Sequence, residues 1–92
     1  MNHLEAAFNE FHGENPRVYQ LFCEYAQELI GRGYKRFSSD AILHRVRWRV
    51  EVDEGGKRMR LNDHWTAYYA RLWLRDHPDH PRFFELRTVT RD

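Results

Sequence analysis

Residues 45–52, which read RVRWRVEV, decide how the middle of the chain folds. Val46, Trp48, Val50 and Val52 alternate with polar residues, as in a strand with one apolar face. Ile42, Val46 and Val50 recur every four residues, as on one face of a helix. Both templates fit, so periodicity alone does not choose between a helix and a strand.

The flanking residues divide this stretch into two parts. Upstream, Ser38 or Ser39 can cap a helix whose first turn contains Asp40, a favourable acid near the helix N-terminus. Downstream, the DEGG sequence at 53–56 is typical of a turn between two short extended segments. We therefore predict a helix to about Trp48, a strand over 50–53, a turn, and a second strand over 57–61.

Three further helices are predicted from capping residues and apolar stripes. The first follows a possible cap at Asn2 and stops near Gly13. The second begins at Asn15 and Pro16, since proline favours the first helical position, and ends near Gly31. A fourth helix is predicted from Asn62 or Asp63 to about Asp76, and 81–89 fits either a short helix, which we favour, or an edge strand.

Length and composition indicate one domain over residues 1–92, with no further domain or linker. Apolar residues make up 41% of the chain, enough for a folded core. No apolar run approaches the roughly 20 residues of a membrane helix, so no membrane partner is expected. Cys23 is the only cysteine and cannot form an internal disulfide. These features predict a cytoplasmic setting.

The fourth helix and its neighbours supply most of the predicted core. At about 100° per residue, apolar side chains cover most of the circumference of this helix, which predicts packing on several sides. The core is predicted to contain Phe8, Phe11, Phe22, Tyr25, Leu29, Ile42, Val46, Trp65, Tyr69, Leu72 and Trp73.

Charge is unevenly distributed although the net charge is only +1. Residues 1–31 carry −4, residues 32–60 carry +5, and residues 61–92 are neutral. The basic residues are 13 Arg and 2 Lys. Arginine suits phosphate and carboxylate recognition, so the basic middle indicates an anionic partner, although a solvated surface explains the same pattern.

The sequence contains no recognisable catalytic arrangement. The GRG sequence at 31–33 lacks the Lys-Ser/Thr of a phosphate loop, and Cys23 fits a buried helical thiol better than a nucleophile. The DHPDHP segment at 76–81 holds potential zinc ligands, but its spacing fits a polar turn better. We expect no enzyme activity, no metal and no cofactor.

Two basic clusters favour DNA as the partner. Along the fourth helix, His64, Tyr68, Arg71 and Arg75 form one polar stripe that could enter a major groove. Around the predicted hairpin, basic side chains could contact the phosphate backbone in the manner of a wing. The residues nominated there are Lys57, Arg58 and Arg60, with Arg45 and Arg49 on the preceding segment.

Two observations count against DNA and keep a second hypothesis open. If 45–49 is helical, Arg47 lies about 200° from Arg45, and only Arg49 shares its side of the helix. About a dozen residues also separate the third and fourth helices, whereas a helix-turn-helix uses 3–4. The alternative is a protein-interaction module with Trp48, Phe83 and Phe84 as an exposed aromatic patch, which would bind another protein or a second copy.

Three stretches together resemble small proteins encoded in phage and prophage genomes. They are FHGENPRVYQLFCEYAQELIGRGYKRFSSDAILHRVRW at 11–48, LNDHWTAYYARLWLRDHP at 61–78, and FFELR at 83–87. The resemblance covers about residues 8–87. It implies a winged-helix-like fold, a phage context in the host cytoplasm, and a small non-enzymatic domain.

The expected fold is thus mainly α, a four-helix winged-helix-like domain with a small β-hairpin. The expected function is that of a DNA-binding accessory or regulatory protein of phage type. The alternative is a protein-interaction module that binds host or phage machinery.

Overall fold

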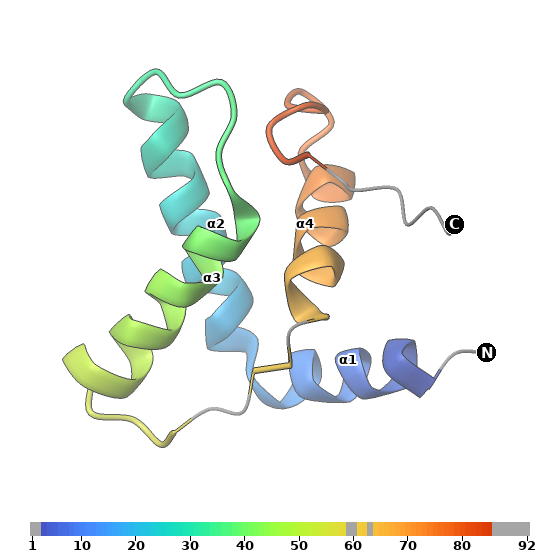
Figure 1. Ribbon diagram of the computed structural model, residues 1–92, viewed down its shortest axis with the longest axis vertical. Coiled ribbons are helices and arrows are strands. Elements are labelled where there is room, and N and C mark those ends of the chain that lie inside the picture. The colour runs from blue at the N-terminus through green and yellow to red at the C-terminus, as the bar shows by residue number, and fades with distance from the viewer. Residues whose placement is uncertain (1–2, 59–60, 63, 86–92) are drawn as a thin grey trace, which may run out of the picture.

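The computed structural model describes residues 3–58, 61–62 and 64–85. Over these residues the chain forms four α-helices and one π-helical turn: α1 (His3–Glu14), α2 (Pro16–Gly31), α3 (Ser39–Trp48), η1 (Arg49–Asp53) and α4 (Trp65–Asp76). Figure 1 shows α2 and α4 running roughly upright, α3 slanting to the lower left, and α1 lying across the bottom right. The prediction of a mainly helical fold is confirmed.

Local signals explain where the central helices begin. Pro16 is the first residue of α2, as predicted. Ser38 caps α3, because its hydroxyl accepts a 3.1 Å hydrogen bond from the Ala41 backbone N–H. Before α4, the Asn62 side chain accepts a 2.9 Å hydrogen bond from the His64 backbone N–H, and α4 starts at Trp65. Asn2 and Asp63, the other proposed caps, lie outside the described residues.

The junction between α1 and α2 differs from the prediction at Gly13. This glycine does not end the first helix, which continues through Glu14. Only Asn15 separates the two helices, and its side-chain amide donates a 2.9 Å hydrogen bond to the Phe11 carbonyl instead of capping α2. The bond satisfies a carbonyl near the end of α1 and fixes the sharp turn into α2.

One hydrophobic core joins all four helices. Trp73, Tyr69 and Phe22 are its largest fully buried side chains, and α4 contributes the first two. The predicted core is confirmed for eight of its eleven members, whereas Phe11, Leu29 and Leu72 are only partly buried at its edge. The prediction missed seven buried residues: Val18, Leu21, Ala26, Leu43, Ala70, Phe83 and Phe84.

The predicted β-hairpin is wrong. Residues 49–53 continue α3 as the π-helical turn η1 rather than forming a strand, and the described residues contain no strand. Residues 57, 58 and 61 of the second predicted strand are irregular, and 59–60 lie outside the described residues. The helical pattern prevails because Ile42 and Val46 are buried against α2 and α4, while Trp48 and Val52 remain exposed. Without a hairpin the predicted wing is missing from the described part of the chain.

The segment after α4 covers one end of the core. Residues 81–85 form turns, so the helix and the edge strand proposed there are both wrong for these residues, and 86–89 lie outside the description. Phe83 and Phe84 are each 2% exposed and pack on Trp73. The Phe37 backbone N–H donates a 3.1 Å hydrogen bond to the Phe83 carbonyl, which joins this segment to the α2–α3 loop.

Among the described helices, none is long and apolar enough to cross a membrane.

Candidate interaction surfaces

The polar stripe predicted on α4 is only partly available to a partner. His64, Arg71 and Arg75 are exposed, but Tyr68 is half-buried and stacks on Phe8 of α1 with 4.9 Å between ring centroids. The guanidinium of Arg71 lies 5.0 Å from the centre of the Tyr68 ring, a cation–π contact. Tyr68 therefore packs between α1 and Arg71 of α4, and its ring is not free to contact a DNA groove.

Arg75 already has an acidic neighbour. Its guanidinium lies 3.2 Å from the carboxylate of Asp76. Asp76 also accepts a 2.7 Å hydrogen bond from the hydroxyl of Tyr19 on α2. That hydrogen bond is the main reason why the pKa of Asp76 is lowered, so the carboxylate stays charged beside Arg75. Of the three exposed stripe residues, His64 and Arg71 have no ion pair within the described chain.

Arg45 and Arg49 converge on one tyrosine of α2. The guanidinium of Arg45 lies 4.4 Å from the centre of the Tyr25 ring, and Arg49 donates a 3.2 Å hydrogen bond to the Tyr25 hydroxyl. The helical geometry places these two arginines on the same side, as predicted. Arg47 points elsewhere and pairs with Glu51 at 3.3 Å. Arg45 and Arg49 thus connect α3 and η1 to α2, whereas Arg47 does not contribute to this contact.

Glu54 joins this cluster to the start of α2. Its carboxylate lies 2.6 Å from Arg17 and 3.2 Å from Arg49. The hydrogen bond from Arg17, followed by the charges of both arginines, lowers the pKa of Glu54. Neither arginine is therefore a free cation. The pairing of Arg17 with Glu54 could not be predicted from sequence, because the two residues are far apart in the chain.

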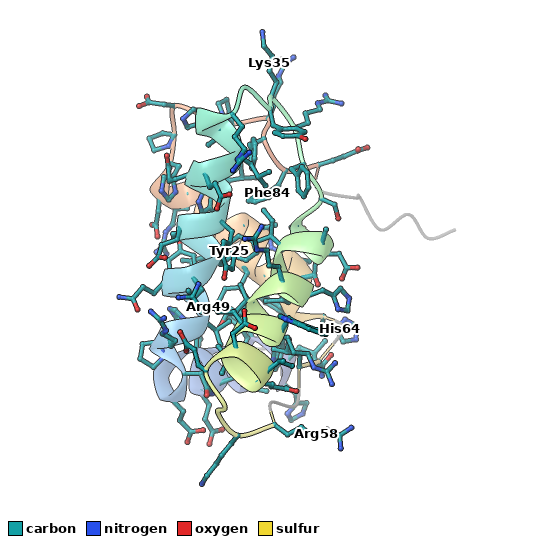
Figure 2. The ribbon with its side chains drawn as sticks, turned by 90° about the vertical axis from the view of Figure 1, so that its left-hand side faces the viewer. Tyr25, Lys35, Arg49, Arg58, His64 and Phe84 are labelled. Atoms are coloured by element: carbon teal, nitrogen blue, oxygen red, sulfur yellow. The ribbon has the colours of Figure 1, made fainter. Side chains whose placement is uncertain are left out.

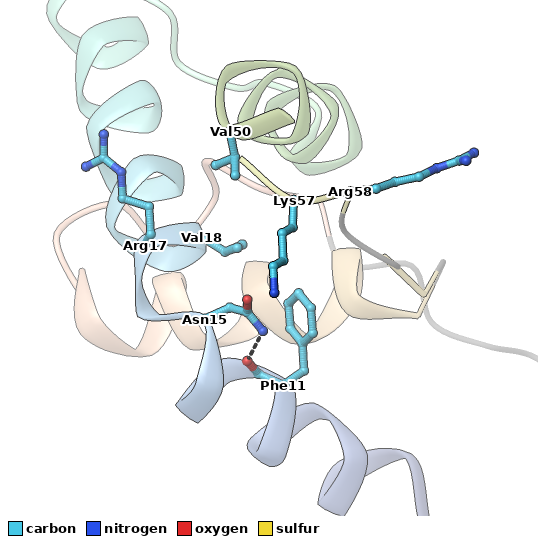
Figure 3. Close-up of a pocket in the computed structure, with 7 residues that line it drawn as sticks. All are labelled: Phe11, Asn15, Arg17, Val18, Val50, Lys57 and Arg58. Carbon is cyan, nitrogen blue, oxygen red and sulfur yellow. Dashed lines mark hydrogen bonds between the residues drawn. The ribbon is translucent and has the colours of Figure 1, made fainter. Parts of the chain in front are cut away.

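Lys57 and Arg58 border a cavity of about 390 Å³ between the α1–α2 junction and the end of η1. Its apolar wall is formed by Phe11, Val18 and Val50. Figure 3 shows Lys57 reaching across the cavity toward Phe11, whereas Arg58 points away from it. Both cations come from the predicted hairpin, but they do not lie together on a wing. The third, Arg60, lies outside the described residues.

The nominated residues do not share one face. In Figure 2, Arg49 lies on the near side by α2 and α3, while His64 and Arg58 lie along the right-hand edge. Arg71 projects from α4 beside α1, through its contact with Tyr68. The structure thus brings Arg45 together with Arg49, and Arg71 together with Tyr68, but it does not join the two predicted clusters into one surface.

The most exposed large apolar side chains lie on α3 and η1. Trp48 is 62% exposed and Val52 is 54% exposed, whereas the other two tryptophans, Trp65 and Trp73, are buried. Exposed residues follow one another at helical spacing to form what we call the α3 face, made of Ala41, Arg45, Trp48 and Val52. The predicted exposure is confirmed for Trp48 and wrong for Phe83 and Phe84, so these three residues do not form one aromatic patch. Helical periodicity carried through residue 52 would have identified Val52.

The exposed side of α1 has the opposite character. Ala6, Glu10, Gly13 and Glu14, here called the α1 face, are exposed and have small or acidic side chains. Neither glutamate forms an ion pair with another described residue. No heavy atom lies within 4 Å of a Cβ placed on Gly13, so this part of the helix is open and flat.

The described residues show no reactive centre. No group of three His, Cys, Asp or Glu side chains among them could hold a metal ion. Burial raises the pKa of the Cys23 thiol, which disfavours the reactive thiolate. The Tyr69 side chain is buried, and burial raises the pKa of its hydroxyl well above the ordinary value.

Comparisons with protein families, curated proteins and solved structures find no match for this chain. The resemblance to phage proteins therefore stays a prediction.

Proposed function

We propose that this chain is a non-catalytic protein-interaction module that binds its partner through the α3 face. The observation that carries the proposal is the exposure of Trp48 at the centre of that face. Tryptophan and arginine are the side chains most enriched among residues that dominate binding energy. Trp48 and Val52 are i, i+4 neighbours and are both exposed, and contiguous exposed apolar surface is typical of an interaction site.

The α3 face is held rigidly, which suits a binding surface. Ile42, Leu43 and Val46 anchor the inner side of α3 in the core. On the outer side, Arg45 and Arg49 are held by Tyr25. Because these side chains are already positioned, little conformational entropy is lost when a partner binds.

Capture of partners by matched variants tests the proposal. The tagged wild-type chain, Trp48→Ala and Tyr34→Ala would be recovered from cells of the source organism. Tyr34, which is 50% exposed, is the control because it is a large aromatic outside the α3 face. Specific partners should be lost with Trp48→Ala and retained with Tyr34→Ala. Equal recovery by all three chains would refute the proposal.

DNA binding is the second candidate function. It is supported by four exposed basic side chains that have no carboxylate partner among the described residues: Lys57, Arg58, His64 and Arg71. Such cations can approach phosphates without first breaking an internal ion pair.

Gel shifts at several salt concentrations test DNA binding. Affinity should fall with salt with a slope of about −0.9 per phosphate contacted. Replacing both Arg71 and Arg75 with alanine should abolish the shift. The absence of any complex at low salt with host and phage DNA would exclude this function.

A further inference from the structure

We infer that the α3 face binds the α1 face of a second copy of this chain. The inference rests on the proposed function and names the partner of that surface. Two exposed helix faces of opposite character lie on one molecule, and each has the shape and charge that the other requires.

Shape is the first part of the argument. Arg45 and Trp48 project long side chains from the α3 face, whereas Ala6 and Gly13 leave the α1 face flat. The residues Ala41, Arg45 and Trp48 have the same i, i+4, i+7 spacing as Ala6, Glu10 and Gly13. Large side chains on one helix fit over small residues on another, because the two backbones can then approach closely.

Charge is the second part. The first 31 residues carry −4 and the next 29 carry +5. Arg45 rests on an aromatic ring and has no carboxylate partner among the described residues, and Glu10 and Glu14 also lack a described ion-pair partner. Opposite charges across an interface fix its register and disfavour like-charged alternatives.

Position explains why the contact must form between two molecules. In Figure 1, α1 lies along the bottom right, while α3 descends to the lower left. One chain cannot fold the two faces together without separating α1 from its contacts with α2 and α4. Two copies can bring the α3 face of one chain against the α1 face of the other.

Sedimentation of the full chain over a wide concentration range tests the inference. The wild type should associate, more strongly in low salt because the contact is partly ionic. Trp48→Ala should weaken association about thirty-fold or more, as expected for a central hot-spot residue. Tyr34→Ala, which removes an exposed aromatic elsewhere, should not change it.

Exchanging the charges of the two faces distinguishes this contact from non-specific association. Arg45→Glu alone and Glu10→Arg alone should each weaken association, because like charges then face each other. Mixing the two variants should restore it, since each mutated face meets a complementary partner in the mixed pair. Circular dichroism would establish that both variants remain folded, and Glu10→Arg tests the idea even if Arg45→Glu disturbs the contact with Tyr25.

The following results distinguish failure of the proposed self-association from failure of the proposed interaction module. If the wild type stays monomeric at millimolar concentration while Trp48-dependent capture of other proteins persists, the self-association is wrong and the interaction module stands. If association persists but mixing the charge variants does not restore it, the α1 face is not the partner. If Trp48→Ala alters neither association nor capture, both proposals fail.

Discussion

At the residue scale, the aromatic side chains of the core carry polar atoms with very different surroundings. Tyr19 donates its hydroxyl hydrogen to Asp76, whereas the Tyr69 hydroxyl is buried and has no hydrogen-bond partner among the described residues. The sequence predicted that Tyr69 would be buried, because it lies on the apolar side of α4. It could not predict the fate of its hydroxyl, which depends on side chains from α1 and α2 that pack around it.

Replacing Tyr69 with phenylalanine should not destabilise the protein. A buried hydroxyl without a partner loses its hydrogen bonds to water on folding, at a cost of about 1–3 kcal/mol. Removing it keeps the ring contacts with Phe8 and Phe22. The free energy of unfolding in urea should stay constant or rise by about 1 kcal/mol. A clear decrease would mean that the hydroxyl has a stabilising partner in solution.

At the element scale, the stretch 45–52 shows why a strand and a helix were hard to separate. Val46 and Val50 satisfy both periodicities, so the choice depends on where Trp48 and Val52 can go. A strand would place Trp48 and Val52 on the same side as the buried Val46. A helix places them on the opposite, solvent-exposed side, as observed. Sequence alone favoured a hairpin because DEGG is a turn signal, but Asp53 still belongs to η1 and Gly55, with a φ of +65°, follows its end without flanking strands.

Replacing Gly13 and Gly55 with alanine should change the stability of the protein in opposite directions. Gly13 lies inside α1 with open space around it, so Gly13→Ala should stabilise the protein by about 0.5–1 kcal/mol. Gly55 has a φ of +65° in the turn after η1, so Gly55→Ala should destabilise it by about 1–2 kcal/mol. Urea denaturation of dilute protein measures both. If Gly55→Ala is harmless, the turn differs from the one described.

The hydrogen bond between α2 and α4 should make stability depend on pH through Asp76. The Tyr19 hydroxyl holds the pKa of Asp76 below its ordinary value of 3.8. Because the folded-state pKa is lowered, the stabilising contribution is present above the unfolded value and is lost as pH falls through the folded value.

Tyr19→Phe removes the main cause of this shift. The pKa of Asp76 should return toward its ordinary value, as followed by NMR of the carboxyl carbon. The variant should be less stable than the wild type at neutral pH, and the difference should narrow in acid. Tyr34→Phe, which changes an exposed tyrosine on the α2–α3 loop, serves as the control. An unchanged Asp76 titration in Tyr19→Phe would contradict the proposed cause.

At the scale of the whole molecule, the sequence predicted the four helices but not how the core is closed. Pro16, Ser38 and the apolar stripes are local signals, and the helices begin where those signals lie. Phe83 and Phe84 are adjacent residues in a turn and follow no periodicity, so burial of both could not be predicted. Likewise, Arg45, Arg49 and Tyr68 could be assigned to their segments, but their partners Tyr25 and Phe8 come from other helices.

The closing segment should therefore be essential to the stability of the whole domain. Phe84 is 2% exposed and contacts Phe22 of α2 and Trp73 of α4, so it joins two helices at one end of the core. Phe84→Ala should cost about 3–5 kcal/mol. For a chain of this length the total free energy of unfolding is about 5–14 kcal/mol, so this single change removes a large share.

Denaturant unfolding followed by tryptophan fluorescence measures the loss, with Tyr34→Ala as a surface control that should change stability by less than about 0.5 kcal/mol. Similar stability for both variants would mean that the core is closed without the segment after α4.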